Sequence, residues 1–120
     1  MSIWIDLPGG HRIGPGEVLL LEAIEETGSI SAAGRKMGMS FSQAWHRVKK
    51  IDGSLMNPAV GTKTGGYTRQ GATLTPLGKQ LIKLYRSIEH SARSGARQDL
   101  KAVQRLVGTT AIKRRSASSV

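Results

Sequence analysis

The side chains best suited to recognising another molecule lie on one stretch of the chain, residues 41–51. Apolar residues recur there at three or four positions apart (Phe41, Ala44, Val48 and Ile51), which predicts a helix with one buried face. The other positions are polar or basic and would point outward. Glutamine suits adenine and arginine suits guanine, because each can make two hydrogen bonds to one base edge. We therefore expect base contacts from Ser42, Gln43, His46 and Arg47.

Basic residues in and around this stretch are candidates for holding a DNA backbone, whose phosphates attract lysine and arginine whatever the base sequence. We expect phosphate contacts from Arg35, Lys49, Lys50, Lys63 and Arg69. Trp45 lies beside the apolar stripe. Two interpretations stay open for it, packing against the core and contact with a base.

The charge of the chain is unevenly distributed. The 120 residues carry a formal net charge of +10, and the pI is near 10.7. Up to Ile30 there are one basic and five acidic residues, whereas from Ser31 onward there are 17 basic and three acidic ones. The positive charge begins with the segment of residues 28–52, which includes the candidate base contacts, and this favours double-stranded DNA as the partner. A soluble protein that is merely basic remains the alternative.

The composition argues against an enzyme and against a metal site. The three histidines, His11, His46 and His90, are far apart in sequence, and the eight acidic residues suit a solvated helix face. The absence of cysteine excludes disulfides and thiolate metal ligands. We therefore expect no catalytic residue, no metal and no cofactor. The chain lacks a secretion signal and any run of membrane-spanning length, so we expect no membrane partner and a cytoplasmic location.

The elements that must position these residues are two short helices joined by a tight turn, over residues 28–52. Ser31 is expected to cap the first helix and Ser40 the second, because a serine hydroxyl can accept from the unpaired amides of a first turn. Gly38 stands where a helix end favours a left-handed residue. This arrangement predicts a helix-turn-helix. An apolar helix over residues 17–26 is expected to pack across it.

Short strands are expected on either side of these helices. Residues 3–7 and 11–13 predict a hairpin around a Pro-Gly-Gly turn. Residues 59–62 and 72–75 predict two strands around a glycine-rich loop, the wing that can follow a helix-turn-helix. The fold class expected is mainly α. It is a winged helix-turn-helix with a short N-terminal β-hairpin, a two-stranded wing and a long C-terminal dimerisation helix.

The long helix is expected to begin at Thr75-Pro76, with the threonine as cap and the proline in the first turn. Its apolar residues follow at spacings of four, three and four, at Leu77, Leu81, Leu84 and Ile88. This seam is the expected dimerisation surface, with packing on the same domain as the alternative. We expect one domain over residues 1–94, a break near residues 91–95, a short helix over residues 95–108 and a disordered basic tail over residues 109–120.

These motifs together resemble a known family. GSIS, MSFSQAW, a wing with two adjacent glycines and LTPLG are similar to the N-terminal, LysR-like DNA-binding domain of ModE-type, molybdate-responsive regulators. The resemblance covers residues 3–84. It implies a dimeric transcriptional regulator, usually a repressor, that reads a near-palindromic DNA site with the helix at residues 41–51. It also implies a dimer interface made by the first helix and the long helix after the wing.

The resemblance has one departure, and two other functions stay open. Family members sense molybdate through a separate C-terminal domain, for which we expect no room after Gly108, so molybdate is an effector by resemblance only. The alternatives to a sequence-specific regulator are a non-specific or architectural nucleic-acid binder and a winged-helix module for protein interactions. The non-specific binder would share the charge but would not need the defined polar face at residues 41–51.

Overall fold

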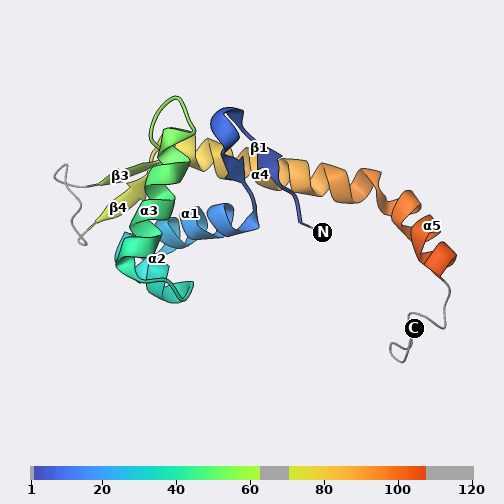
Figure 1. Ribbon diagram of the computed structural model, residues 1–120, viewed down its shortest axis with the longest axis horizontal. Helices are drawn as coiled ribbons and strands as arrows, with labels where there is room; N and C mark the ends of the chain where they lie inside the picture. Colours follow the sequence, from blue (N-terminus) through green and yellow to red (C-terminus); the bar gives the residue numbers. More distant parts are fainter. Residues whose placement is uncertain (1, 63–70, 108–120) are drawn as a thin grey trace. The chain divides into compact units, whose positions relative to one another are not determined.

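The computed structural model describes residues 2–62 and 71–107 of the chain (Figure 1). Contacts within the chain divide it into two units, residues 1–87 and residues 88–120. The strands and helices of the described residues follow in the order β1 (Ile5–Asp6), β2 (Arg12–Ile13), α1 (Pro15–Thr27), α2 (Ile30–Lys36), α3 (Phe41–Gly53), β3 (Val60–Thr62), β4 (Ala72–Leu74), α4 (Pro76–Gly95) and α5 (Arg97–Val107). The predicted fold class, a mainly helical winged helix-turn-helix with a hairpin before it, is confirmed.

The N-terminal hairpin has shorter strands than the sequence pattern predicts. β1 and β2 pair antiparallel over two residues each. A single 3-10 turn, Pro8–Gly10, joins them, and its two glycines have φ angles of +83° and +82°. Glycine adopts this left-handed conformation without a side-chain clash, so the turn can be this tight.

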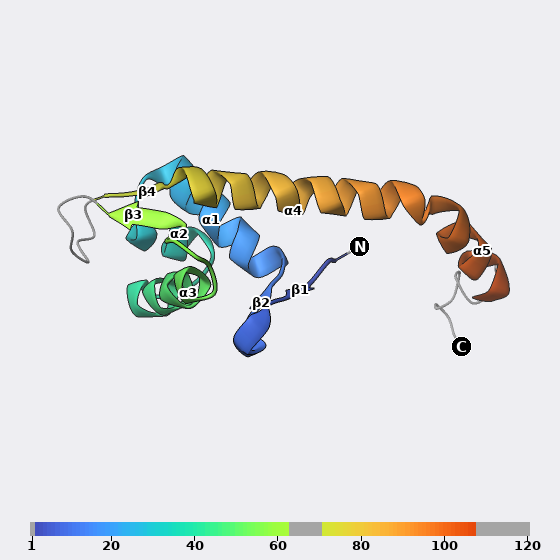
Figure 2. The same ribbon diagram turned by 90° about the horizontal axis from the view of Figure 1, so that it is seen from above.

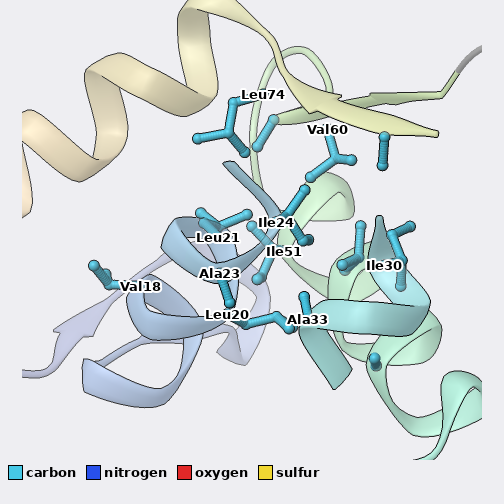
Figure 3. Close-up of a cluster of buried hydrophobic side chains, with 14 of the residues drawn as sticks. Val18, Leu20, Leu21, Ala23, Ile24, Ile30, Ala33, Ile51, Val60 and Leu74 are labelled. Atoms are coloured by element: carbon cyan, nitrogen blue, oxygen red, sulfur yellow. The ribbon is translucent and has the colours of Figure 1, made fainter. Parts of the chain in front are cut away.

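Helix α1 lies at the centre of the hydrophobic core (Figure 3). It contacts α2, α3 and β4, as expected for a helix that packs across the helix-turn-helix. It ends at Gly28, whose φ is +74° and whose N–H donates to the carbonyl oxygen of Ile24 at 2.8 Å. Its buried side chains are Val18, Leu20, Leu21, Ala23 and Ile24.

Helices α2 and α3 form the predicted helix-turn-helix, with one correction at its start. Ser29, not Ser31, caps α2, because the Ser29 Oγ accepts from the N–H of Ala32 at 3.0 Å. Ser31 lies inside the helix, where its hydroxyl oxygen accepts from Arg35 Nη1 at 3.2 Å. The earlier start brings Ile30 into the helix and buries its side chain in the core.

The turn between α2 and α3 is tight. Gly38 has a φ of +74°, as predicted for this position. The N–H of Met39 donates to the carbonyl oxygen of Gly34 at 2.7 Å. A Cβ atom added to Gly34 would lie 2.9 Å from the Cβ of Ala44. Because Gly34 has no side chain, the backbone of α2 can pack directly against the Ala44 side chain of α3.

Strands β3 and β4 pair antiparallel, as predicted for the wing, with Val60 opposite Leu74 and both side chains buried. The N–H of Ala72 donates to the carbonyl oxygen of Gly28 at 2.9 Å, which ties β4 to the end of α1. The glycine-rich loop between the strands, residues 63–70, lies outside the described residues.

Helix α4 begins as predicted, with Thr75 as its cap: the Thr75 Oγ1 accepts from the N–H of Gly78 at 3.1 Å. Gly78 allows close packing on the segment before β3, because a Cβ atom there would lie 2.3 Å from the carbonyl oxygen of Ala59. Tyr85 is fully buried, and its hydroxyl donates to the carbonyl oxygen of Ile3 at 2.7 Å. This bond ties α4 to the N-terminal segment.

The predicted seam residues of α4 differ in exposure. Leu77 and Leu81 are half-buried, and Leu81 packs against the core. Leu84 is 53% exposed and Ile88 is 45% exposed. Packing on the same domain therefore accounts for the start of the seam, whereas the side chains further along are largely uncovered by the described residues.

In the unit of residues 88–120, α4 continues to Gly95 and α5 begins at Arg97. The break therefore falls at Ala96, just beyond the expected range of residues 91–95. The apolar side chains of α5, Leu100, Val103, Leu106 and Val107, are exposed. The tail predicted over residues 109–120 lies outside the described residues.

Candidate nucleic-acid interface

The outward face of α3 is defined by the residues that anchor its other face. Ala44, Val48 and Ile51 are buried, and Phe41 packs against the core. All four predicted base contacts and two predicted phosphate contacts are therefore brought onto one helix surface. The exposed polar and basic side chains of α3 that form this surface are Ser42, Gln43, His46, Arg47, Lys49 and Lys50.

Gln43 is a predicted base contact that also takes part in the cap of α3. The Ser40 Oγ accepts from the Gln43 N–H at 3.1 Å, and the Gln43 Oε1 accepts from the Ser40 N–H at 3.0 Å. This reciprocal pair is a capping box, which satisfies two amide groups at a helix start. The carboxamide oxygen of Gln43 is engaged in the cap, so its NH2 group is the part that can donate to a base.

His46 and Arg47 each lie close to a polar group of the protein, a backbone carbonyl for His46 and a carboxylate for Arg47. His46 Nδ1 lies 2.8 Å from the carbonyl oxygen of Ser42. Arg47 Nη1 lies 3.6 Å from Oε2 of Glu17, a side chain that is only 16% exposed. The other carboxylate oxygen of Glu17 accepts from the N–H of Gly14 at 2.9 Å, at the start of α1. Glu17 is fixed by this cap and in turn orients the guanidinium of Arg47.

Trp45 packs rather than pointing away from the protein. Its side chain is half-buried against the core. Its ring meets the His46 ring edge-on at 5.3 Å between centroids, and Lys49 Nζ lies 5.7 Å from its centroid. The structure supports the packing interpretation, in which Trp45 positions two of the predicted DNA contacts.

The remaining predicted phosphate contacts are less closely grouped. Arg35 is exposed in the last turn of α2. Lys63 and Arg69 lie outside the described residues, so their role stays a prediction.

Asp52 joins the end of α3 to the wing. Its Oδ1 accepts from the N–H of Ala59 at 2.8 Å, just before β3. Burial raises the pKa of the Asp52 carboxyl, although the Ala59 N–H and the charge of Lys49 act in the opposite direction. The bond fixes where the wing begins relative to the recognition helix.

A cleft of about 500 Å³ lies between α3 and the N-terminal hairpin. Its lining includes Trp4, His11 and Arg12 from the hairpin side and His46, Arg47 and Lys50 from α3. His11 and His46 are far apart in sequence, but the fold brings both to this cleft. Among residues 2–62 and 71–107, no group of three or more His, Cys, Asp or Glu side chains could hold a metal ion.

The arrangement of α2, α3 and the β3–β4 sheet defines a winged helix-turn-helix. The solved structure of a DNA-binding domain of CbnR in complex with DNA has the same fold, with a TM-score of 0.55 and 20% identity. The similarity covers 72% of this chain and 95% of that one. No family model matches the chain.

Curated proteins give a more specific relationship. The chain is 46% identical over 80 residues to the molybdenum-pterin-binding protein MopB of Rhodobacter capsulatus, covering 67% of this chain and 30% of MopB. It is 28% identical over 120 residues to the molybdenum transport protein ModE of Azotobacter vinelandii, covering 91% and 44%. It is 35% identical over 71 residues to the DNA-binding transcriptional dual regulator ModE of Escherichia coli K12, covering 59% and 27%.

The chain therefore carries a winged helix-turn-helix domain of the ModE type, and it spans less than half the length of each of these relatives. The resemblance seen in GSIS, MSFSQAW and LTPLG is confirmed. None of the helices in the described part of the chain is long and apolar enough to cross a membrane.

Proposed function

We propose that this chain is a sequence-specific DNA-binding transcriptional regulator that reads base edges with α3. The observation that carries the proposal is the anchored geometry of this helix. Ala44, Val48 and Ile51 hold one face in the core, so the polar face is presented in a fixed orientation. The major groove of DNA is about 12 Å wide and admits a helix of this kind. Relatives named as transcriptional regulators support the proposal.

Within this surface, Arg47 is proposed to carry the largest share of base discrimination. Its guanidinium can donate two parallel hydrogen bonds to O6 and N7 of guanine. Its pairing with Glu17 spans 3.6 Å, and the arginine side chain is 45% exposed. The Arg47 side of the pair is solvated and the separation exceeds hydrogen-bond length, so the guanidinium can turn to a base while Glu17 limits its orientations. Ser42, His46 and the NH2 group of Gln43 are proposed to contact neighbouring bases.

Phosphate contacts are proposed to set the register of α3 in the groove. The phosphates on the two edges of the groove would be contacted by Arg35, Lys49 and Lys50. Lys63 and Arg69 of the wing loop are proposed as further contacts. Contacts of this kind position a protein on DNA without selecting a base sequence. They would therefore supply affinity for any duplex, to which the base contacts add preference.

We further propose that two copies act together through α4. The exposed apolar side chains Leu84 and Ile88 extend a seam that Leu77 and Leu81 begin. A two-fold dimer would place two α3 helices on half-sites about one turn of DNA apart, so the site would be nearly palindromic. A dimer bound at a promoter would block access to it, so repression is the proposed outcome.

The affinity for DNA is expected to fall steeply with salt. If about six to eight phosphates are neutralised per complex, the log-log slope against salt concentration should be about −6. Fluorescence anisotropy of a labelled duplex, titrated at several salt concentrations, measures this slope. A slope near zero would contradict DNA binding by the basic face.

Competition with random DNA separates the three candidate functions. A sequence-specific regulator retains its own promoter duplex against an excess of random competitor. A non-specific binder shows the same salt slope and no preference. A protein-interaction module shows no measurable binding near physiological salt, because it needs no phosphate contacts.

A further inference from the structure

The N-terminal hairpin lies beside the recognition helix. The hairpin and α3 line the same cleft. Figure 2 shows the turn of the hairpin extending to the level of α3, and in Figure 1 the hairpin and the β3–β4 sheet lie on either side of this helix. A duplex lying along the outward face of α3 would therefore have the wing on one side and the hairpin on the other.

The charged side chains that line this cleft are net positive, with Arg12, Arg47 and Lys50 against Glu17. Among the described residues that line it, the carboxylate of Glu17 is already engaged by the N–H of Gly14 and by Arg47. Such a lining favours an anion, and the position next to α3 favours the anion that any duplex bound there must present, a backbone phosphate. The basic and imidazole side chains that line the cleft are His11, Arg12, His46, Arg47 and Lys50.

Arg12 is held in an orientation that leaves donors for such a phosphate. Its Nε donates to Oδ1 of Asp6 at 2.8 Å, and its guanidinium carbon lies 5.7 Å from the ring centroid of Trp4. A guanidinium has five N–H donors, and the Asp6 bond uses the one on Nε. The Arg12 side chain is 59% exposed, so its terminal NH2 groups can reach a ligand in solution.

The tip of the hairpin offers little steric hindrance. Gly9 and Gly10 are exposed and carry no side chain, so a DNA backbone can approach the peptide backbone closely. Both have φ above +80°, a backbone conformation that is strained for most residues with a side chain. The same two residues thus allow the tight turn and leave its surface bare.

We propose that the N-terminal hairpin is a DNA-contacting element in addition to α3 and the wing. Arg12 and His11 hold a backbone phosphate in the cleft, opposite Lys50 of α3. This inference rests on the proposed function of α3 and adds a flanking contact on the side away from the wing. A free phosphate ion has the same chemistry, but the position of the cleft beside the recognition helix favours the phosphodiester of a bound strand.

The first test compares Arg12→Ala with Lys79→Ala. Both changes remove one positive charge, but Lys79 is exposed on α4 and does not line the cleft. On duplexes that extend beyond the bases that α3 contacts, Arg12→Ala is expected to weaken binding about fivefold whatever their sequence and to reduce the steepness of the salt slope by about one. Lys79→Ala is expected to leave both quantities close to those of the unchanged protein. Equal effects of the two variants would overturn the inference.

A second variant distinguishes the loss of a phosphate contact from a loosening of the hairpin, either of which could follow from removing Arg12. Asp6→Asn keeps the shape of the side chain but removes the carboxylate that competes with a phosphate for Arg12. The variant is expected to raise the affinity for DNA about two- to threefold, whereas unfolding of the hairpin would lower that affinity. An unchanged or lower affinity would contradict a phosphate at Arg12.

Duplex length and free phosphate separate the two sources of the anion. On a duplex trimmed to the bases that α3 contacts, Arg12→Ala is expected to lose its effect, because the flanking phosphate is gone. Inorganic phosphate that binds the cleft while Arg12→Ala leaves DNA affinity unchanged would overturn the assignment to DNA. If the unchanged protein binds no DNA at all, the proposed function of α3 fails; if it binds and Arg12→Ala has no effect, only the hairpin inference fails.

Discussion

Replacing Arg47 with alanine is expected to flatten the base preference at one position of the DNA site. A guanidinium bonded to O6 and N7 of guanine contributes about 1–3 kcal/mol of discrimination against the other bases. The variant should therefore bind the four base pairs at that position almost equally, while its affinity for random DNA falls much less. Binding to a duplex series, with each base pair substituted in turn, measures this loss.

Lys50→Ala is the matched control on the same helix. Lys50 is exposed and is proposed to contact phosphate, so its loss should weaken all duplexes alike and leave the preference intact. The Arg47 variant should fold normally, because Glu17 keeps its bond to the N–H of Gly14 and the lost Arg47 side chain is 45% exposed. If the two variants behaved identically, the division between base contacts and phosphate contacts would be wrong.

Replacing Gly78 with alanine is expected to lower the free energy of unfolding by about 1–3 kcal/mol or more. The added Cβ would lie 2.3 Å from the carbonyl oxygen of Ala59, a backbone atom that also accepts from the N–H of Thr75 at 2.9 Å. The backbone cannot yield without moving the start of β3 or of α4. Urea denaturation followed by circular dichroism measures the change in stability.

Gly53→Ala provides a control with the opposite expected sign. Gly53 is the last residue of α3, and a Cβ atom there meets no heavy atom within 4 Å. Alanine in a helix is favoured over glycine by up to about 1 kcal/mol, so this variant should be as stable as the unchanged protein or more stable. Equal destabilisation by both substitutions would mean that the close packing of α4 on Ala59 is not what Gly78 provides.

Local sequence patterns were sufficient to predict most of the elements. The spacing of the apolar residues on α3 and the glycine at position 38 each reflect the backbone within a few residues, which is why they can be interpreted from the sequence. The cap of α2 was assigned wrongly because GSIS offers two serines, and the burial of Ile30 favours the earlier one. The capping box at Ser40 has a visible signature, a glutamine three residues later, that the prediction of Gln43 as a base contact overlooked.

Contacts between distant segments could not be predicted in the same way. The pairing of Glu17 with Arg47 and the cleft shared by His11 and His46 depend on how α1 and the hairpin pack on α3. No local periodicity carries that information. The seam on α4 shows the same limit, because apolar spacing indicates which residues share a face and not what covers them.

The most direct test of the central claim is selection of bound duplexes from a random pool by the unchanged protein. Reading of base edges by α3 in a dimer predicts enrichment of one consensus with two related half-sites about one turn of DNA apart. The same selection with Arg47→Ala should lose information at one base pair of each half-site. A pool that stays random after selection, although the protein binds it with a steep salt dependence, would contradict sequence-specific recognition.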